Sequence, residues 1–121
     1  MNGLIASAKR IDEYGAPLDC VKNTRLPIGM TGLSHILKAH FAAALNADCG
    51  RPVLVITADE AQASRLALDM KTLGCRALLY PARDFAFRSP ESPSREYEHR
   101  RLGVLDKMLR GEAQAVICSA A

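Results

Sequence analysis

Short apolar runs alternate along this chain with stretches whose apolar residues recur at helical spacing. The clearest run, residues 53–56, is rich in β-branched residues, lies between Pro52 and Thr57, and is short enough for a buried parallel strand. Further strands are expected at residues 25–28, 76–80 and 115–118. Strands that alternate with helices of about a dozen residues build parallel βαβ units. The sequence therefore predicts an α/β fold in which helices cover both faces of a parallel sheet.

The best-defined helix is expected to follow Asp59. Asp59 and Gln62 have the spacing of a capping box, with aspartate in place of the usual serine or threonine. The buried stripe of this helix is expected to comprise Ala63, Leu66, Ala67, Met70 and Leu73, and Gly74 ends it. Two more helices are expected, one of roughly residues 33–46 before a turn at 48–50, and one that contains Tyr97, Leu102, Leu105, Met108 and Leu109 and ends at Gly111.

The N-terminal part of the chain predicts a short amphipathic helix over residues 2–14, because Leu4, Ile5, Ala8 and Ile11 share one stripe. Gly15 and Pro17 are expected to stop this helix, which leaves residues 18–23 as a connector. Residues 81–94 contain three prolines and mixed charge, so a loop or small insertion is expected there.

The composition of the 121 residues favours one domain or less, and 49% hydrophobic residues are enough for a core. The net charge of +3 is spread over interspersed acidic and basic residues, so charge alone favours neither nucleic acid nor an anionic membrane. Four widely spaced cysteines, Cys20, Cys49, Cys75 and Cys118, form no metal-binding pair and predict free thiols. The sequence shows no secretory signal and no membrane-spanning run of ~20 apolar residues, so a cytoplasmic location is expected.

A glycine-containing segment that starts at Gly29 has the layout of a phosphate-binding loop but lacks the chemistry of one. The working pattern is G-x-x-x-x-G-K-[ST], in which lysine neutralises phosphate charge and the hydroxyl holds Mg²⁺. Counted from Gly29, the last three positions hold Ser34, His35 and Ile36, of which none can replace its counterpart. An ordinary strand-to-helix turn is the other interpretation. The segment is therefore treated as a vestigial loop, not expected to bind ATP, formed by Gly29, Thr31, Gly32, Ser34, His35 and Ile36. No catalytic residue and no metal site are predicted.

Arginines and aromatic residues between positions 83 and 101 offer a possible nucleic-acid surface. Arg83, Arg88, Arg95, Arg100 and Arg101 interleave with Phe85, Phe87 and Tyr97, a composition that can hold phosphates and stack bases. The acidic residues Asp84, Glu91, Glu96 and Glu98 nearly cancel this charge. Solvated arginines are the commoner explanation of such a pattern, so weak or no direct contact with DNA is expected.

Four segments in one order carry a resemblance to a known family. They are residues 31–34 running into 37–39, residues 52–57 with 61–68, residues 80–84 with 92–94, and the helix at 101–110 leading into 115–120. Together they resemble the N-terminal UvrB-homology module of the bacterial transcription-repair coupling factors, the Mfd family, over about residues 24–121. The resemblance implies a degenerate P-loop NTPase lobe of the RecA-like helicase kind. It divides the chain into an N-terminal helix and connector, residues 1–23, and the first part of the UvrB-like nucleotide-binding domain, residues 24–121.

Two departures from UvrB itself favour the coupling factors. UvrB has an intact Gly-Lys-Thr at the positions of Ser34, His35 and Ile36. It also has a long aromatic-rich hairpin where this chain has only residues 84–88 and a stretch of proline and serine. The loop and the hairpin are thus both reduced here.

The resemblance implies a non-catalytic domain in the module that recruits UvrA during transcription-coupled nucleotide excision repair. In that family the UvrA contact lies mainly in the following domain, and downstream motor domains use ATP and Mg²⁺ to translocate on DNA and displace stalled RNA polymerase. No cofactor is expected in this segment. The alternative is the front half of an active UvrB-like or other superfamily 2 helicase ATPase domain, which the missing lysine argues against. Because the last expected strand is a buried one, the chain is further expected to be a truncated fragment with an unfinished sheet.

Overall fold

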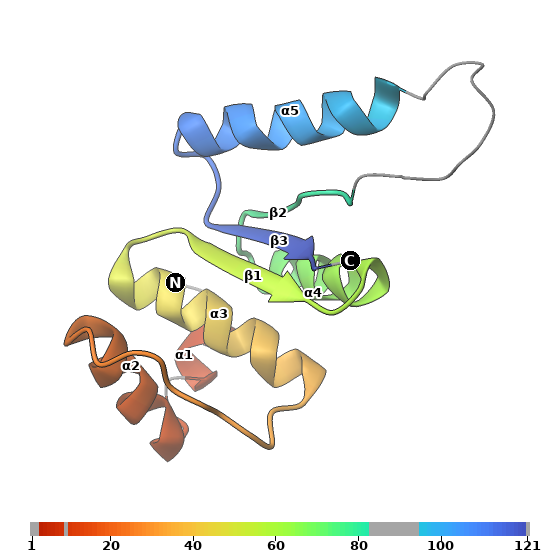
Figure 1. The fold of residues 1–121 in the computed structure, drawn as a ribbon. Helices are drawn as coiled ribbons and strands as arrows, with labels where there is room; N and C mark the ends of the chain where they lie inside the picture. Colours follow the sequence, from red (N-terminus) through yellow and green to blue (C-terminus); the bar gives the residue numbers. More distant parts are fainter. Residues whose placement is uncertain (1–2, 9, 83–94, 121) are drawn as a thin grey trace.

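A three-stranded parallel sheet forms the centre of the fold in the computed structural model, which describes residues 3–8, 10–82 and 95–120 (Figure 1). The strands are β1 (Val53–Thr57), β2 (Ala77–Leu79) and β3 (Ala115–Ser119), in the order β1-β3-β2. The register pairs Ala115 with both Val53 and Ala77. The predicted α/β class and the parallel sheet are confirmed.

Helices cover both faces of this sheet, as expected. The helices α3 (His35–Cys49) and α4 (Glu60–Thr72) lie on one face, and α5 (Arg95–Leu109) lies on the other (Figure 1). The larger core cluster joins α3, α4 and the sheet, and it includes Ala39, Ala43, Ala44, Ala63, Leu66, Ala67, Met70, Ala115 and Ile117. A smaller cluster under α5 contains Val104, Ala113 and Val116.

Helix α4 matches the prediction from its capping residues and its stripe. The Asp59 carboxylate accepts a hydrogen bond from the Gln62 backbone N–H at 2.8 Å, and the Gln62 side-chain amide donates to the same carboxylate at 3.0 Å. All five residues of the expected stripe are buried. Gly74 follows the helix with a φ of 82°, the left-handed conformation that glycine adopts without strain.

The N-terminal segment is more helical than predicted. It contains α1 (Gly3–Ala8), a short 3-10 helix η1 (Asp12–Tyr14) and α2 (Gly15–Lys22). The expectation that Gly15 and Pro17 stop a helix was wrong, because both lie in the first turn of α2. Proline is tolerated there since the N–H groups of the first turn have no acceptor within the helix.

Tyr14 fastens this segment to α3. Its hydroxyl donates to the Asp48 carboxylate at 2.7 Å, and its ring meets Phe41 edge-on with 5.4 Å between centroids. Burial and the bond to Asp48 raise the pKa of the Tyr14 hydroxyl well above its ordinary value. The N-terminal helices are therefore part of the packed structure.

The strand expected at residues 25–28 does not form. The backbone N–H of Arg25 instead donates to the Cys20 carbonyl at 2.9 Å and closes the end of α2. Pro27 has no N–H to give to a ladder, and Leu26 and Ile28 are exposed. Among the described residues, the sheet therefore has three strands where four were expected.

The last strand in the chain occupies the middle of the sheet. β3 pairs with β1 on one side and with β2 on the other, so both of its own edges are occupied. Among the described residues, the open edges belong to β1 and β2.

The ends of α3 and α5 also differ from the prediction. Helix α3 runs to Cys49, and Gly50 caps it at a φ of 63°. Helix α5 ends before Gly111 as expected. Among its described side chains Val104 is buried, whereas Leu102, Leu105, Met108 and Leu109 are exposed. The loop or insertion expected at residues 81–94 lies mostly outside the described residues.

Within the described part of the chain, no helix has the length and apolar character needed to cross a membrane.

Replacing Ile117 by alanine should destabilise the fold strongly, because this side chain is fully buried in the central strand. The expected loss in the free energy of unfolding is about 2–5 kcal/mol, from lost burial and the cavity left behind. The matched control is Leu68→Ala on α4, where the side chain is 64% exposed and the change should stay within about 0.5 kcal/mol. Urea unfolding followed by circular dichroism measures both. Equal losses for the two variants would contradict the assigned core.

Candidate functional site

The vestigial loop runs into α3, whose first two residues are His35 and Ile36, and α3 places it at the end of the sheet where the strands finish. Asn46, near the end of α3, donates from its side-chain amide to the Gln114 carbonyl at 3.1 Å, just before β3 begins. The other end of α3 therefore points toward the carboxyl edge of the sheet (Figure 1). In parallel α/β folds this edge binds ligands, and helix N-termini there bind phosphates.

Ser34 is the N-cap of α3. Its hydroxyl accepts a hydrogen bond from the backbone N–H of Leu37 at 3.4 Å, and its backbone is extended. A serine hydroxyl in this position satisfies one of the free N–H groups at the start of a helix. In this structure that donor is already engaged by the chain itself.

The other loop residues surround an open turn. Gly32 has a φ of 78°, a left-handed conformation that explains why glycine occupies this position. Gly29 does not have a positive φ. A Cβ atom added at either glycine would meet nothing within 4 Å. Thr31, His35 and Ile36 are exposed on the same segment. The structure thus brings Ser34, His35 and Ile36 together at the start of α3, but the loop does not form a tight cradle.

A polar cluster at the same edge of the sheet was missed by the sequence reasoning. The Glu60 carboxylate accepts hydrogen bonds from the Ser119 hydroxyl at 3.2 Å and from the Ala82 backbone N–H at 3.3 Å. Glu60 begins α4, Ser119 ends β3 and Ala82 follows β2. The cluster therefore ties the ends of separate elements together, and local sequence patterns carry no signal for it.

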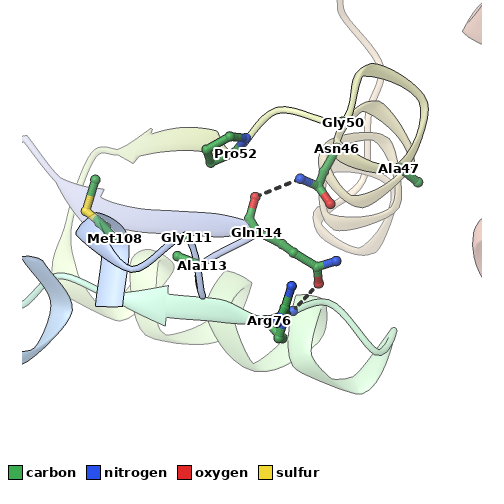
Figure 2. Close-up of a pocket in the computed structure, with 9 residues that line it drawn as sticks. All are labelled: Asn46, Ala47, Gly50, Pro52, Arg76, Met108, Gly111, Ala113 and Gln114. Carbon is green, nitrogen blue, oxygen red and sulfur yellow. Dashed lines mark hydrogen bonds between the residues drawn. The ribbon is translucent and has the colours of Figure 1, made fainter. Parts of the chain in front are cut away.

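A cavity of about 410 Å³ lies at the opposite, amino edge of the sheet (Figure 2). Its nine lining residues are Asn46, Ala47, Gly50, Pro52, Arg76, Met108, Gly111, Ala113 and Gln114. The Asn46 amide donates to the carbonyls of Arg51, at 2.8 Å, and Gln114, and the Gln114 side chain accepts from the Arg76 backbone N–H at 2.8 Å. These bonds connect the starts of all three strands to α3, so the polar groups of the cavity serve the fold.

The cysteines remain free thiols, as predicted. Cys75 is buried, and burial raises the pKa of its thiol, which disfavours the reactive thiolate. Cys20, Cys49 and Cys118 are half-buried on separate elements. Within residues 3–8, 10–82 and 95–120, no three His, Cys, Asp or Glu residues gather into a possible metal site.

The arginines considered for DNA contact have partners within the chain where they are described. Arg100 pairs with Glu96 at 2.6 Å, and the Arg101 guanidinium lies 4.7 Å from the centroid of the Tyr80 ring. Glu98 is exposed on α5. The remaining members of that pattern lie outside the described residues or have side chains that are not described; they are Arg83, Asp84, Phe85, Phe87, Arg88, Glu91, Arg95 and Tyr97. The described part of this pattern therefore offers little free positive charge.

No protein-family model matches this sequence, no curated protein matches it, and no solved structure matches its fold.

Removing the Ser34 hydroxyl should weaken α3. Because the bond to Leu37 is long, Ser34→Ala is expected to lower the free energy of unfolding by about 0.5–1 kcal/mol, and Ser34→Gly by a few tenths. Ser64→Ala, within α4, is the control and should cause no loss, since alanine is the better helix former. Urea unfolding resolves the three variants. A loss no larger for Ser34→Ala than for Ser64→Ala would show that Ser34 does not cap the helix.

Proposed function

We propose that this chain is a non-catalytic structural domain, the first part of a degenerate UvrB-like, RecA-like nucleotide-binding lobe in a transcription-repair coupling factor. Its role is to hold the module that recruits UvrA. The following domain supplies most of the UvrA contact. RNA polymerase and DNA are bound by downstream domains, among them motor domains that use ATP and Mg²⁺, and the whole protein acts in the cytoplasm.

The start of α3 is the observation that carries this proposal. A nucleotide-binding loop needs free backbone N–H groups, an ammonium group and a hydroxyl that holds Mg²⁺. Here the Ser34 hydroxyl engages the N–H of Leu37, and exposed His35 and Ile36 stand at the lysine and hydroxyl positions. The place of a phosphate site is kept, while the groups that would bind phosphate and metal are replaced.

The fold supports the same proposal in a coarser way. The loop leads into a helix that packs beneath a parallel sheet and is followed directly by β1, which is the order of a nucleotide-binding βαβ unit without its first strand. A small parallel sheet of this kind hosts many functions, so the loop and the motif order carry more weight than the architecture.

The alternative, the front half of an active helicase ATPase domain, predicts a nucleotide site at the same loop. It requires a lysine or an equivalent cation beside the phosphates, and mutational losses of ~10²–10³ are typical when one such electrostatic contact is removed. Nucleotide binding therefore separates the two functions.

Titration calorimetry with ATP and Mg²⁺ should detect no micromolar binding to this chain. The triple variant Ser34→Gly, His35→Lys, Ile36→Thr restores the three motif positions and should still show no turnover, because residues 115–121 include no acidic residue to hold the metal. A micromolar dissociation constant for the unmodified chain would contradict the proposal and favour the ATPase alternative.

Retention of UvrA should depend on the following domain. In a pull-down, residues 1–121 are expected to retain UvrA weakly or not at all, whereas the complete UvrB-homology module of a coupling factor retains it. The triple loop variant serves as a control and should behave like the unmodified chain. Equal retention by residues 1–121 and the complete module would place the UvrA contact here instead.

A further inference from the structure

The outer edge of β1 is open in the described structure. The Val53 N–H donates to the Gln114 carbonyl at 3.0 Å, and the Thr57 carbonyl accepts from the Ala120 N–H at 2.8 Å. In a parallel ladder the residues that bond to one neighbour alternate with residues that face the other side. Hence the backbone groups of Leu54 and Ile56 point away from β3, toward an edge where no described strand pairs.

The side chains on this edge are apolar as well as exposed. Leu54 and Ile56 are each 63% exposed and lie on the face of the sheet that α5 covers only in part. The five residues of β1 include no proline, glycine or charged residue, which are the usual devices that protect an edge strand. An edge of this kind is a template for a further strand.

Helix α5 extends this apolar surface. Leu105 and Met108 are 42% and 44% exposed, and Met108 lines the same cavity as Pro52, the residue before β1. Met108 therefore lies near the residue that precedes β1, and Leu105 stands three positions before it on the same face of the helix. Together, Leu54, Ile56, Leu105 and Met108 form what we call the β1 apolar edge.

We propose that the β1 apolar edge binds a second copy of this chain, through antiparallel pairing of the two β1 strands about Val55. A two-fold axis at Val55 then relates the two copies, and it places Leu54 of each copy opposite Ile56 of the other. Since the outward backbone groups belong to these same residues, each pair can exchange both of its N–H···O bonds. The two pairs also bring four apolar side chains together on one face of the joined sheet.

Self-complementarity is the reason for choosing a second copy over an unrelated strand. The same axis sets Arg51, before the strand, opposite Asp59 of the second copy, beyond its strand, and both residues are exposed. Opposite charges at the two ends favour this register over a shifted one. The interface is nonetheless small beside the ~800 Å² per partner of stable complexes, so a dissociation constant on the order of 0.1 mM is expected.

Sedimentation equilibrium of the full chain between about 10 μM and 1 mM tests this, and should show a reversible monomer–dimer equilibrium. Ile56→Lys should raise the dissociation constant at least about tenfold, because it places a charge on the pairing surface. Leu68→Lys is the matched control, since Leu68 is 64% exposed on α4 and should leave the equilibrium unchanged. Circular dichroism confirms that both variants are folded.

A cysteine at position 55 tests the register itself. In the proposed pairing Val55 faces Val55 of the second copy in a non-hydrogen-bonded pair, with Cα atoms about 4.5 Å apart, within the range that a disulfide bridges. Val55→Cys should therefore form a 55–55 crosslink under oxidising conditions, identified by mass spectrometry. Leu54→Cys should not link to itself, because those two positions are offset along the strands beyond ~7 Å.

Three outcomes would overturn the proposal. One is a monomer at every concentration up to about 1 mM. Another is equal weakening by Ile56→Lys and Leu68→Lys, which would place the contact elsewhere or make it non-specific. The third is a 54–54 crosslink in preference to a 55–55 crosslink, which would show a different pairing.

Discussion

Small side chains between α3, α4 and β3 set the spacing on which the rest of the structure depends. Ala39 and Ala44 of α3, Ala63 of α4 and Ala115 of β3 have no exposed surface. Because alanine adds only a methyl group, the two helices can approach each other and the central strand closely. Larger side chains in such a layer typically cost about 1–3 kcal/mol each through displaced backbone and strained rotamers. With three strands in its described part, the sheet relies on this close helical support.

Elements whose signals are local were predictable from the sequence. Asp59 and Gln62 bond each other at the start of α4, and the apolar period of that helix has one consistent face. The start of α2 was misjudged because a proline inside a helix usually ends it. Pro17 lies in the first turn, where a proline is harmless. A strand was wrongly predicted at residues 25–28. The apolar residues there do not show that the Arg25 N–H bonds to the end of α2. In α5 the sequence located the helix but not the buried face, since most of its apolar residues are exposed.

The candidate site was predictable in its position but not in its connections. The glycines and the order of residues place Ser34, His35 and Ile36 at the start of a helix, and the structure agrees. The cap made by Ser34 follows a known local rule. By contrast, the bonds of Glu60 to Ser119 and of Asn46 to Gln114 join residues far apart in the chain. No local pattern specifies such pairs, because they exist only once the sheet order is known.

The central place of β3 also bears on how the protein is made. A ribosome delivers β1 and β2 first, yet among the described strands each of them pairs with β3 and not with the other. During synthesis the chain therefore holds two unpaired apolar strands and can assemble helices, but not the sheet, until β3 has left the exit tunnel. The exposed interval is longest for β1, whose outer edge has no partner among the described strands. Nascent chains of this kind are natural clients of chaperones that shield extended apolar segments.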